Sequence, residues 1–230
     1  MDILFAPMQG YTDAKYRFWH WKNYGGVKEY YTPFVRLEKG RLRDKDRRDL
    51  LPERNKGVPI VPQVIARDRE DFARVCDAVQ KLGWVRIDLN MGCPFPLQTH
   101  AGYGSGLLPH PDRVAAIAEE MKARPEVTFS IKMRLGLNDA EESMALLPII
   151  NEMPLTLVTL HPRLGIQQYT GECDKKAFAR FQNLCLKPMA YNGDIRSKDD
   201  IASISTQFPQ LAAIMIGRGL IDTPDMLKQK

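Results

Sequence analysis

Short apolar runs alternate with amphipathic stretches along the whole chain. Short runs of this kind, with nearly continuous apolar character, are typical of strands covered on both faces. They recur at roughly 25–30 residue intervals, which is the βα repeat of a parallel barrel. The expected strands are Ile3–Ala6, Val27–Thr32, Ile60–Ile65, Val85–Asn90, Thr128–Met133, Thr156–Leu160, Pro188–Tyr191 and Ala212–Ile216.

The segments between these runs carry apolar residues at three- and four-residue spacing, which predicts helices on the outside of a barrel. Gly83 ends the clearest of them. Asp139–Met153 contains Pro148, so we expect a kinked or split helix there. The other predicted helices are Arg67–Leu82, Pro111–Arg124, Lys175–Cys185 and Ser197–Phe208, the last with Ser197 as its cap.

The alternation predicts the α/β class and a (β/α)8 TIM barrel. A doubly wound open sheet would produce the same alternation, and the count of eight strands favours closure. We expect one domain over residues 1–230. Only Thr223–Lys230 remains after the last strand and its loop, so the last helix is expected to be incomplete and to leave apolar surface uncovered.

Composition narrows the function classes only a little. The net charge of +5 and pI near 9.0 permit a polyanion partner without requiring one. The charged run Arg36–Lys56 mixes both signs, which is more typical of a solvated surface than of a binding surface. We find no signal-peptide pattern and no stretch long enough to span a membrane. The four cysteines lack metal-site spacing, so we expect no metal and reduced thiols in a cytoplasmic protein.

In a parallel barrel, chemistry gathers where the strands end. Lys132 and Arg134 are two positions apart and therefore share one face of a strand. An unpaired lysine in a barrel mouth implies an anionic or electron-rich partner, for which a reduced flavin and a sugar phosphate are both suitable. His161 alone is more often structural, and its place in a ring of polar strand ends strengthens a functional interpretation.

Two glycine-containing loops follow the seventh and eighth expected strands. One contains Asn192, Gly193 and Asp194, and the other contains Gly217 and Arg218. Such loops expose peptide N–H groups that bind phosphate, and an arginine adds a charged donor. Either loop alone is a weak signal, but together in barrel register they favour a phosphate site.

Cys93 lies between Gly92 and Pro94, just after the fourth expected strand. A thiol on such a constrained turn is well placed to deliver a proton. The alternative is a structural cysteine that packs as a small hydrophobic residue.

An ordered series of segments resembles the tRNA-dihydrouridine synthases. The individual segments are short and weak, but the series covers Ala6 to Gly219 in the right order and spacing. The segments are APMQGYTD (6–13), TPFVRL (32–37), DLNMGCP (88–94), GYGSGLL (102–108), IKMRLG (131–136), HPR with QQYTG (161–171), NGDI (192–195) and IGRG (216–219).

The resemblance implies reduction of one uridine in tRNA by FMN, with NADPH as the electron donor. Hydride from the flavin would go to C6 of the base, and Cys93 would protonate C5 as a general acid. It further implies that Arg36, Asn90, Arg134 and Tyr169 face the tRNA nucleotide. The residues implied to hold FMN are Pro7, Met8, Gln9, Gln63, Lys132, His161, Asn192, Gly193, Asp194, Gly217 and Arg218.

The chain departs from the family pattern in several places. Gln9 replaces a usual Glu, Pro162 replaces a Gly, and Phe95–His100 lacks the usual lysines. The C-terminal helical domain that grips tRNA in the family is absent, so the sequence is a fragment or its grip on RNA is lost or supplied elsewhere. The segment TPFVRL resembles the class that acts near position 16 of the D-loop.

Two alternatives stay open. One is a flavin barrel that reduces a small pyrimidine or an enone. The other is a barrel remnant that binds RNA or a protein without catalysis. We expect a monomer in each case.

Overall fold

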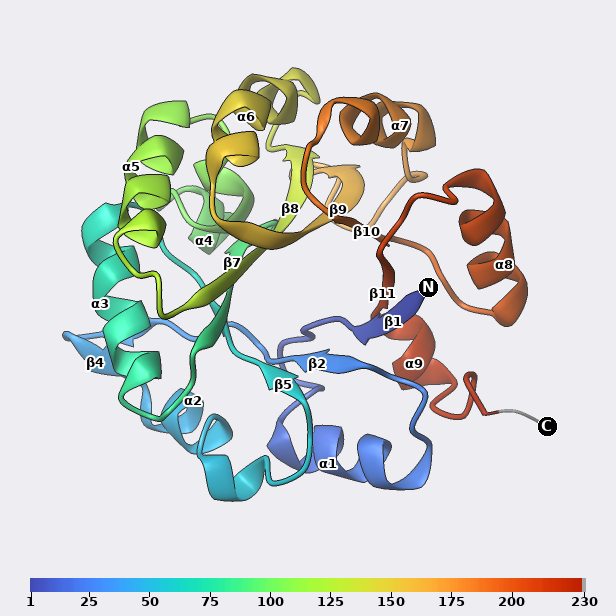
Figure 1. Cartoon of the computed structure of the whole chain (residues 1–230), viewed down its shortest axis with the longest axis horizontal. Helices are drawn as coiled ribbons and strands as arrows, with labels where there is room; N and C mark the ends of the chain where they lie inside the picture. Colours follow the sequence, from blue (N-terminus) through green and yellow to red (C-terminus); the bar gives the residue numbers. More distant parts are fainter. Residues whose placement is uncertain (229–230) are drawn as a thin grey trace.

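The buried apolar runs form parallel strands that lie side by side in a ring, with helices outside it (Figure 1). This computed structural model describes residues 1–228. The barrel strands are β1 (Asp2–Phe5), β2 (Glu29–Tyr31), β5 (Ile60–Val61), β6 (Gln63–Val64), β7 (Arg86–Met91), β8 (Thr128–Gly136), β9 (Leu155–Leu164), β10 (Met189–Asn192) and β11 (Ala213–Ile216). The predicted α/β TIM barrel is confirmed.

The third expected strand is divided into β5 and β6 by Pro62, which has no N–H for a ladder hydrogen bond. Its first half pairs with β2 and its second half with β7, so the division completes the ring. The peptide N–H of Asp88 donates to the carbonyl of Pro62 at 2.9 Å across this junction.

Strands β8 and β9 are longer than the apolar runs suggested. The pairing of Arg134 with His161 extends both strands beyond the predicted ends, so Pro162 and Arg163 belong to β9 rather than to a following loop. This extension carries polar side chains into the barrel mouth on rigid strands.

Helices form in each of the five segments where they were predicted, whereas α1, α2 and α4 form in segments for which no helix was predicted. The helix α6 continues through Pro148, so the predicted split does not occur, because the neighbouring Leu146, Leu147 and Ile150 are buried and hold the helix against the barrel. The helices are α1 (Ala14–Asn23), α2 (Asp44–Asp49), α3 (Arg69–Gln80), α4 (Pro96–Thr99), α5 (Pro111–Lys122), α6 (Glu141–Glu152), α7 (Lys175–Leu184), α8 (Lys198–Gln207) and α9 (Arg218–Asp222).

The charged run after β2 contains a hairpin and two short helices. It forms the hairpin of β3 (Leu37–Glu38) and β4 (Arg41–Leu42), then α2 and a 3₁₀ helix, η1 (Pro52–Arg54). Asp46 is buried within this run and accepts two hydrogen bonds from Arg43, so part of the run is structural.

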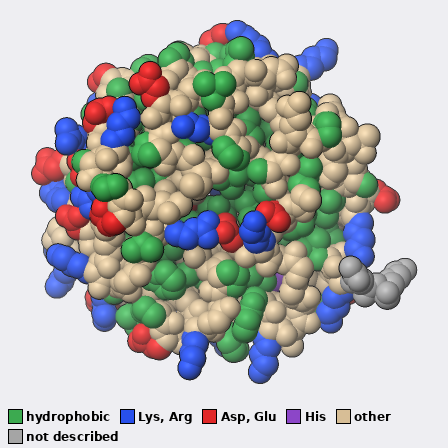
Figure 2. All heavy atoms as spheres, in the orientation of Figure 1, with side chains coloured by type: hydrophobic (Ala, Val, Ile, Leu, Met, Phe, Trp, Pro, Cys, Tyr) green, Lys and Arg blue, Asp and Glu red, His purple; other side chains and the backbone are tan. Residues whose placement is uncertain are grey.

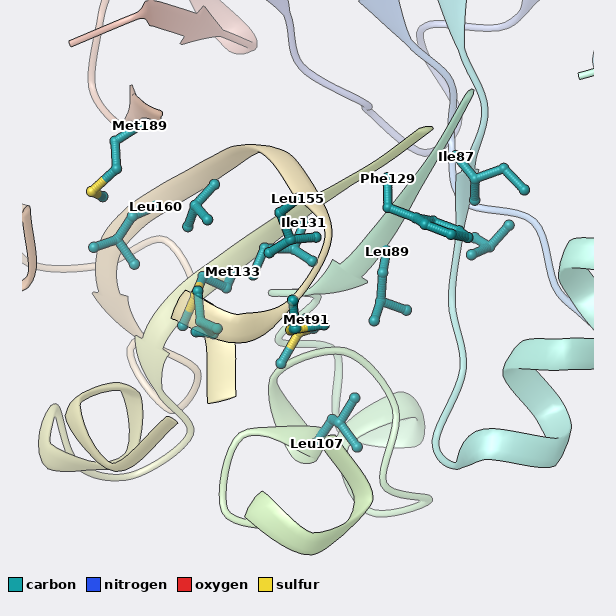
Figure 3. Packing of buried hydrophobic residues seen from close by; sticks show 14 of the residues in the cluster. Ile87, Leu89, Met91, Leu107, Phe129, Ile131, Met133, Leu155, Leu160 and Met189 are labelled. Carbon is teal, nitrogen blue, oxygen red and sulfur yellow. The ribbon is translucent and has the colours of Figure 1, made fainter. Parts of the chain in front are cut away.

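Alternate residues of the strands face opposite sides, and this decides where chemistry can occur. The side chains of Ile87, Leu89 and Met91 on β7 belong to the large core outside the ring, together with Phe129 and Ile131 of β8 (Figure 3). The residues between them therefore point into the barrel. A smaller interior cluster contains Leu4, Ala6, Tyr31, Val61, Ala190, Ala213 and Met215.

The last helix is short, as predicted, and ends at Asp222. After it, Met226 is buried and Leu227 lies against Gly26. The neighbouring helix α1 still exposes Phe18 and Trp19, at 40% and 41%.

Basic and acidic side chains intermingle around the rim of the face shown in Figure 2, with hydrophobic side chains between them. Among the helices of residues 1–228, none has the length and apolar character needed to span a bilayer.

Candidate active site

A cavity of about 640 Å³ opens among the carboxyl ends of the strands. Its volume lies in the range of small-molecule and cofactor sites. Every residue that the sequence analysis assigned to a site lines this cavity, so Cys93 shares it with both glycine loops. The residues are Pro7, Met8, Gln9, Arg36, Gln63, Asn90, Cys93, Lys132, Arg134, His161, Tyr169, Asn192, Gly193, Asp194, Gly217 and Arg218.

The turn that carries Cys93 is held from both sides. The side-chain oxygen of Asn90 accepts the peptide N–H groups of Gly92 and Cys93, at 3.0 and 2.8 Å. The carbonyl of Cys93 accepts the peptide N–H and the hydroxyl of Ser105, at 3.0 and 3.1 Å. Gly104, at φ +60°, has no room for a side chain, because a Cβ atom would lie 2.6 Å from the Cys93 carbonyl oxygen.

The Cys93 thiol keeps its proton at neutral pH. Burial raises its pKa above the usual value, although the peptide group of Phe95 and the charges of Arg134 and Lys132 oppose the shift. Cys93 is half-buried on the cavity wall, unlike Cys76, which packs fully inside the core. This placement favours a proton donor over a structural cysteine.

Lys132 brings a positive charge into the cavity. Burial, and secondarily the charge of Arg134, lowers its pKa to about 8, while the charges of Asp88 and Cys93 oppose the shift. Its ammonium group makes no hydrogen bond or ion pair within residues 1–228. An ammonium group in this position fits an anionic or electron-rich ligand.

Arg134 and Arg218 lie over the ring of Tyr169. Their guanidinium carbons are 5.4 and 5.3 Å from the ring centroid, within the range of cation–π contacts. Arg134 is buried and also donates to the carbonyls of Gly92 and Leu164, at 3.0 and 2.7 Å. Tyr169, which is 54% exposed, presents a flat apolar surface at the entrance.

His161 is held neutral. Burial lowers its pKa well below the usual value, and the charges of Arg134, Lys132, Arg163 and Arg218 act in the same direction. Its Nε2 atom lies 3.1 Å from Nη1 of Arg163. Since a guanidinium can only donate, Nε2 is the acceptor and the ring proton sits on Nδ1.

Arg163 links the histidine to one glycine loop. It donates to both carboxylate oxygens of Asp194, at 3.1 and 2.5 Å, and to the carbonyl of Gly171 at 2.6 Å. Burial favours the neutral form of Asp194, but the hydrogen bonds and charge of Arg163 outweigh it and lower the carboxyl pKa. Arg218 lies 3.3 Å from the same carboxylate.

The two glycine loops form an anion cradle. The peptide N–H groups of Gly193, Asp194, Gly217 and Arg218 have no hydrogen-bond partner in the described part of the chain. Gly193 has φ +150°, and a Cβ atom there would lie 2.5 Å from the sulfur of Cys173. Free N–H groups beside Arg218 fit a phosphate, and the whole cavity fits a phosphate-bearing cofactor with an electron-rich ring.

Buried polar side chains continue inward from Gln63 and Asn90, which line the cavity. The amide nitrogen of Asn90 donates to Oε1 of Gln63 at 2.8 Å, and Nε2 of Gln63 donates to Asp88 at 2.7 Å. Ser130 donates to the other oxygen of Asp88 at 2.6 Å. Burial raises the pKa of Asp88 to about 6, against its hydrogen bonds and the charge of Lys132.

The outer rim comes from the loops after β1 and β2. Nε2 of Gln9 donates to the carbonyl of Phe34 at 2.9 Å, which joins the two loops. Arg36 and Arg43 also line the cavity. The charged run that the sequence analysis interpreted mainly as solvated surface therefore contributes two cations to the site.

A family model described as dihydrouridine synthase (Dus) matches residues 4–230. The chain belongs to the dihydrouridine synthase family. A probable tRNA-dihydrouridine synthase of Rhodobacter capsulatus is 30% identical over 99% of this chain and 70% of that protein. A tRNA-dihydrouridine(16) synthase of Aquipseudomonas alcaligenes is 27% identical over the full chain and 75% of that protein. Membership in this family makes the chain an oxidoreductase of the tRNA-dihydrouridine synthase class.

Solved structures support the fold of this dihydrouridine synthase family member. Histamine dehydrogenase from Rhizobium sp. 4-9 has a TM-score of 0.70 at 14% identity, and the match covers 98% of this chain and 44% of that one. Morphinone reductase has a TM-score of 0.63 at 11% identity, and the match covers 98% of this chain and 84% of that one. At these identities the likeness shows the barrel alone.

Asp88 and Arg163 are two site residues for which no role was predicted from the sequence. Asp88 opens the segment DLNMGCP and Arg163 closes HPR, so both lay beside residues that were assigned. The period-two rule places Asp88 on the face of Asn90 and Arg163 on the face of His161, which is a signal that was present. Their partners were not visible, because Gln63 and Asp194 are 25 and 31 residues away.

Proposed function

We propose that this chain reduces the 5,6 double bond of a uridine in tRNA, using FMN as cofactor and NADPH as the electron donor. The observation that carries the proposal is that Cys93, Lys132 and the two glycine loops line one cavity, and burial there raises the pKa of the thiol. Family membership supplies the reaction class.

Cys93 is the proton donor. When bound, reduced FMN supplies the hydride for C6 of the uracil. Cys93 gives its proton to C5, and the resulting thiolate then recovers a proton from solvent. The raised thiol pKa suits this role, since a cysteine that was already a thiolate would have no proton to give.

The cavity residues divide by chemistry. Gln63, Lys132 and His161 supply polar groups for the ring of FMN, and Pro7, Met8 and Gln9 border it. The peptide N–H groups of Gly193, Asp194 and Gly217, with Arg218, hold the phosphate. Asn192 also belongs to the proposed phosphate site. Its side-chain nitrogen donates to the carbonyl of Met215 at 2.8 Å, which holds the adjacent ends of β10 and β11 together.

The RNA side of the cavity is formed by Arg36, Asn90, Arg134 and Tyr169. A uridine reaches this cavity only after it leaves its stack, at a cost of a few kcal/mol. Tyr169 offers a stacking surface, and Arg36 offers a charge for a phosphate of the RNA backbone. The target position that we propose is uridine 16, since several relatives bear that position in their names.

We propose that the catalytic barrel spans residues 1–230 as one domain, acts as a monomer and works in the cytoplasm. Size-exclusion chromatography with light scattering tests the oligomeric state, and a mass of twice 26.2 kDa contradicts it.

The test of the function is reconstitution. The purified chain with FMN and NADPH should form dihydrouridine in unmodified tRNA, as mapped at nucleotide resolution. Faster turnover of free uridine, uracil or an enone would replace the proposal with the small-molecule reductase. Protein that stays colourless after incubation with FMN would support the non-catalytic alternative. Dihydrouridine at another tRNA position would contradict the assignment of uridine 16 and leave the rest of the proposed function unchanged.

A further inference from the structure

Beneath Gln63 and Asn90 of the cavity wall lies a fully buried acid, Asp88, that the proposed reaction does not use. Strand register places Gln63, Asp88 and Ser130 next to one another on β6, β7 and β8. The carboxylate of Asp88 accepts hydrogen bonds from both neighbours, at 2.7 and 2.6 Å. Asp88 is therefore fixed on two sides.

The orientation of each amide above it follows from the hydrogen-bond chemistry. The peptide N–H groups of Gly92 and Cys93 can only donate, so the atom of Asn90 that faces them must be its oxygen. The nitrogen of Asn90 then faces Gln63, which must present its own oxygen at 2.8 Å. The nitrogen of Gln63 is left to face Asp88, where an acceptor is required.

Asp88 is the one group in this series that accepts without donating in its charged form. If it were replaced by a group that offers no acceptor, Gln63 would lose the partner that fixes its direction. A reversed Gln63 would turn N–H groups toward the nitrogen of Asn90. That conflict would loosen the side-chain oxygen of Asn90, which accepts the peptide N–H groups of the Cys93 turn.

The same series decides what this part of the cavity wall offers to a ligand. Gln63 accepts from Asn90 and donates one N–H to Asp88, which leaves it a second N–H to donate. Lys132, next to Asn90 in strand register, is also a donor. A wall of donors suits the electron-rich edge of a reduced flavin.

We propose that Asp88 is a positioning residue: its carboxylate fixes Gln63 and Asn90, holds the turn that carries Cys93, and keeps this part of the cavity wall composed of donors. That this positioning contributes to catalysis rests on the proposed function, in which Cys93 is the proton donor. The positioning itself does not depend on it.

The experiment is hydrogen exchange of the Gly92 and Cys93 peptide groups in the full chain, with FMN added and without RNA. Asp88→Ala should speed their exchange by about tenfold or more, because their acceptor is no longer held. Asp88→Asn should restore protection. Asparagine still gives Gln63 an oxygen, and Ser130 can turn its hydroxyl to accept from the new amide.

Two further variants keep the test decisive. Ser130→Ala removes the other partner of Asp88 and should leave exchange at Gly92 and Cys93 within about twofold of the parent. Gln63→Leu breaks the series above Asp88 and should speed exchange as Asp88→Ala does, without a further increase when the two are combined. If Asp88→Ala does not fold, Asp88→Val, which also offers Gln63 no acceptor and fills more of the space, takes its place and should speed exchange in the same way.

Parent-like exchange of Gly92 and Cys93 in Asp88→Ala or in Gln63→Leu would overturn the proposal. Failure of Asp88→Asn to restore protection would also overturn it, since charge alone would then matter. These results are independent of dihydrouridine formation. A parent chain that forms no dihydrouridine, yet shows this exchange pattern, would contradict the proposed function and leave the positioning role standing.

Discussion

Nη1 of Arg163 donates to Nε2 of His161 at 3.1 Å, and the same guanidinium donates hydrogen bonds to both carboxylate oxygens of Asp194. One side chain of β9 thus orients a histidine of the cavity and fastens the loop after β10. Asp194 has the left-handed φ of +49°, so the loop conformation itself needs support.

We predict that Arg163→Met destabilises the chain by about 1–3 kcal/mol, because the buried guanidinium no longer donates to Asp194 and to the carbonyl of Gly171. The pKa of His161 should rise, since one nearby positive charge is removed, and its ring proton should no longer be confined to Nδ1. Thermal unfolding and ¹⁵N NMR of the ring measure these changes. The control is Arg180→Met, which breaks an exposed ion pair with Glu141 and should cost less than about 1 kcal/mol. Equal losses for the two variants would show that the Arg163 contact adds no stability.

We predict that Cys93→Ala keeps the flavin and its reduction by NADPH but loses dihydrouridine formation by roughly 10²–10⁴-fold, the usual contribution of a general acid. Absorbance reports the first two properties and product mapping the third. Cys185→Ala is the control, because this cysteine is half-buried and does not line the cavity. Full activity of Cys93→Ala would remove the proton-donor role.

Lys132→Met should have opposite effects on stability and on flavin binding. Loss of a charge-assisted hydrogen bond worth about 1.5–3 kcal/mol should weaken FMN binding by more than tenfold. The flavin-free variant should be more stable than the parent at pH 7, because a costly buried charge is gone. Fluorescence titration and chemical denaturation measure the two effects, with the exposed Lys81→Met as control. An unchanged FMN dissociation constant would contradict the assignment of Lys132.

The same lysine predicts a pH dependence. Its pKa is about 8 in the folded chain and about 10.4 when unfolded, so between these values the unfolded chain binds more protons. Stability of the flavin-free chain should therefore rise from pH 8 to pH 10, whereas FMN affinity should fall as the ammonium group loses its charge. Denaturation midpoints across this range test the rise, and Lys132→Met should lack it.

Gly104→Ala should destabilise the chain by about 3 kcal/mol or more, since the new Cβ atom meets the Cys93 carbonyl at 2.6 Å and the φ of +60° is unfavourable. Gly40→Ala is the matched control. Gly40 has φ +76° with nothing within 4 Å of its Cβ position, so only the backbone term of about 1 kcal/mol remains. Similar melting temperatures for the two variants would show that the Cys93 turn tolerates displacement.

The sequence by itself determined the features that depend on near neighbours. The apolar runs gave the strands, the period of two put Lys132 and Arg134 on one face, and Gly92 with Pro94 marked the turn of Cys93. Such features follow from backbone geometry over a few residues, so one chain segment is enough to infer them.

Only the tertiary structure decided which distant groups became partners. Gln63 contacts Asp88, and Arg163 contacts Asp194, across segments tens of residues apart. The strand divided at Pro62 likewise pairs with β2 through one half and with β7 through the other. These contacts depend on the register between strands once the ring has closed, and a shift of one residue would turn every one of these side chains to the other face.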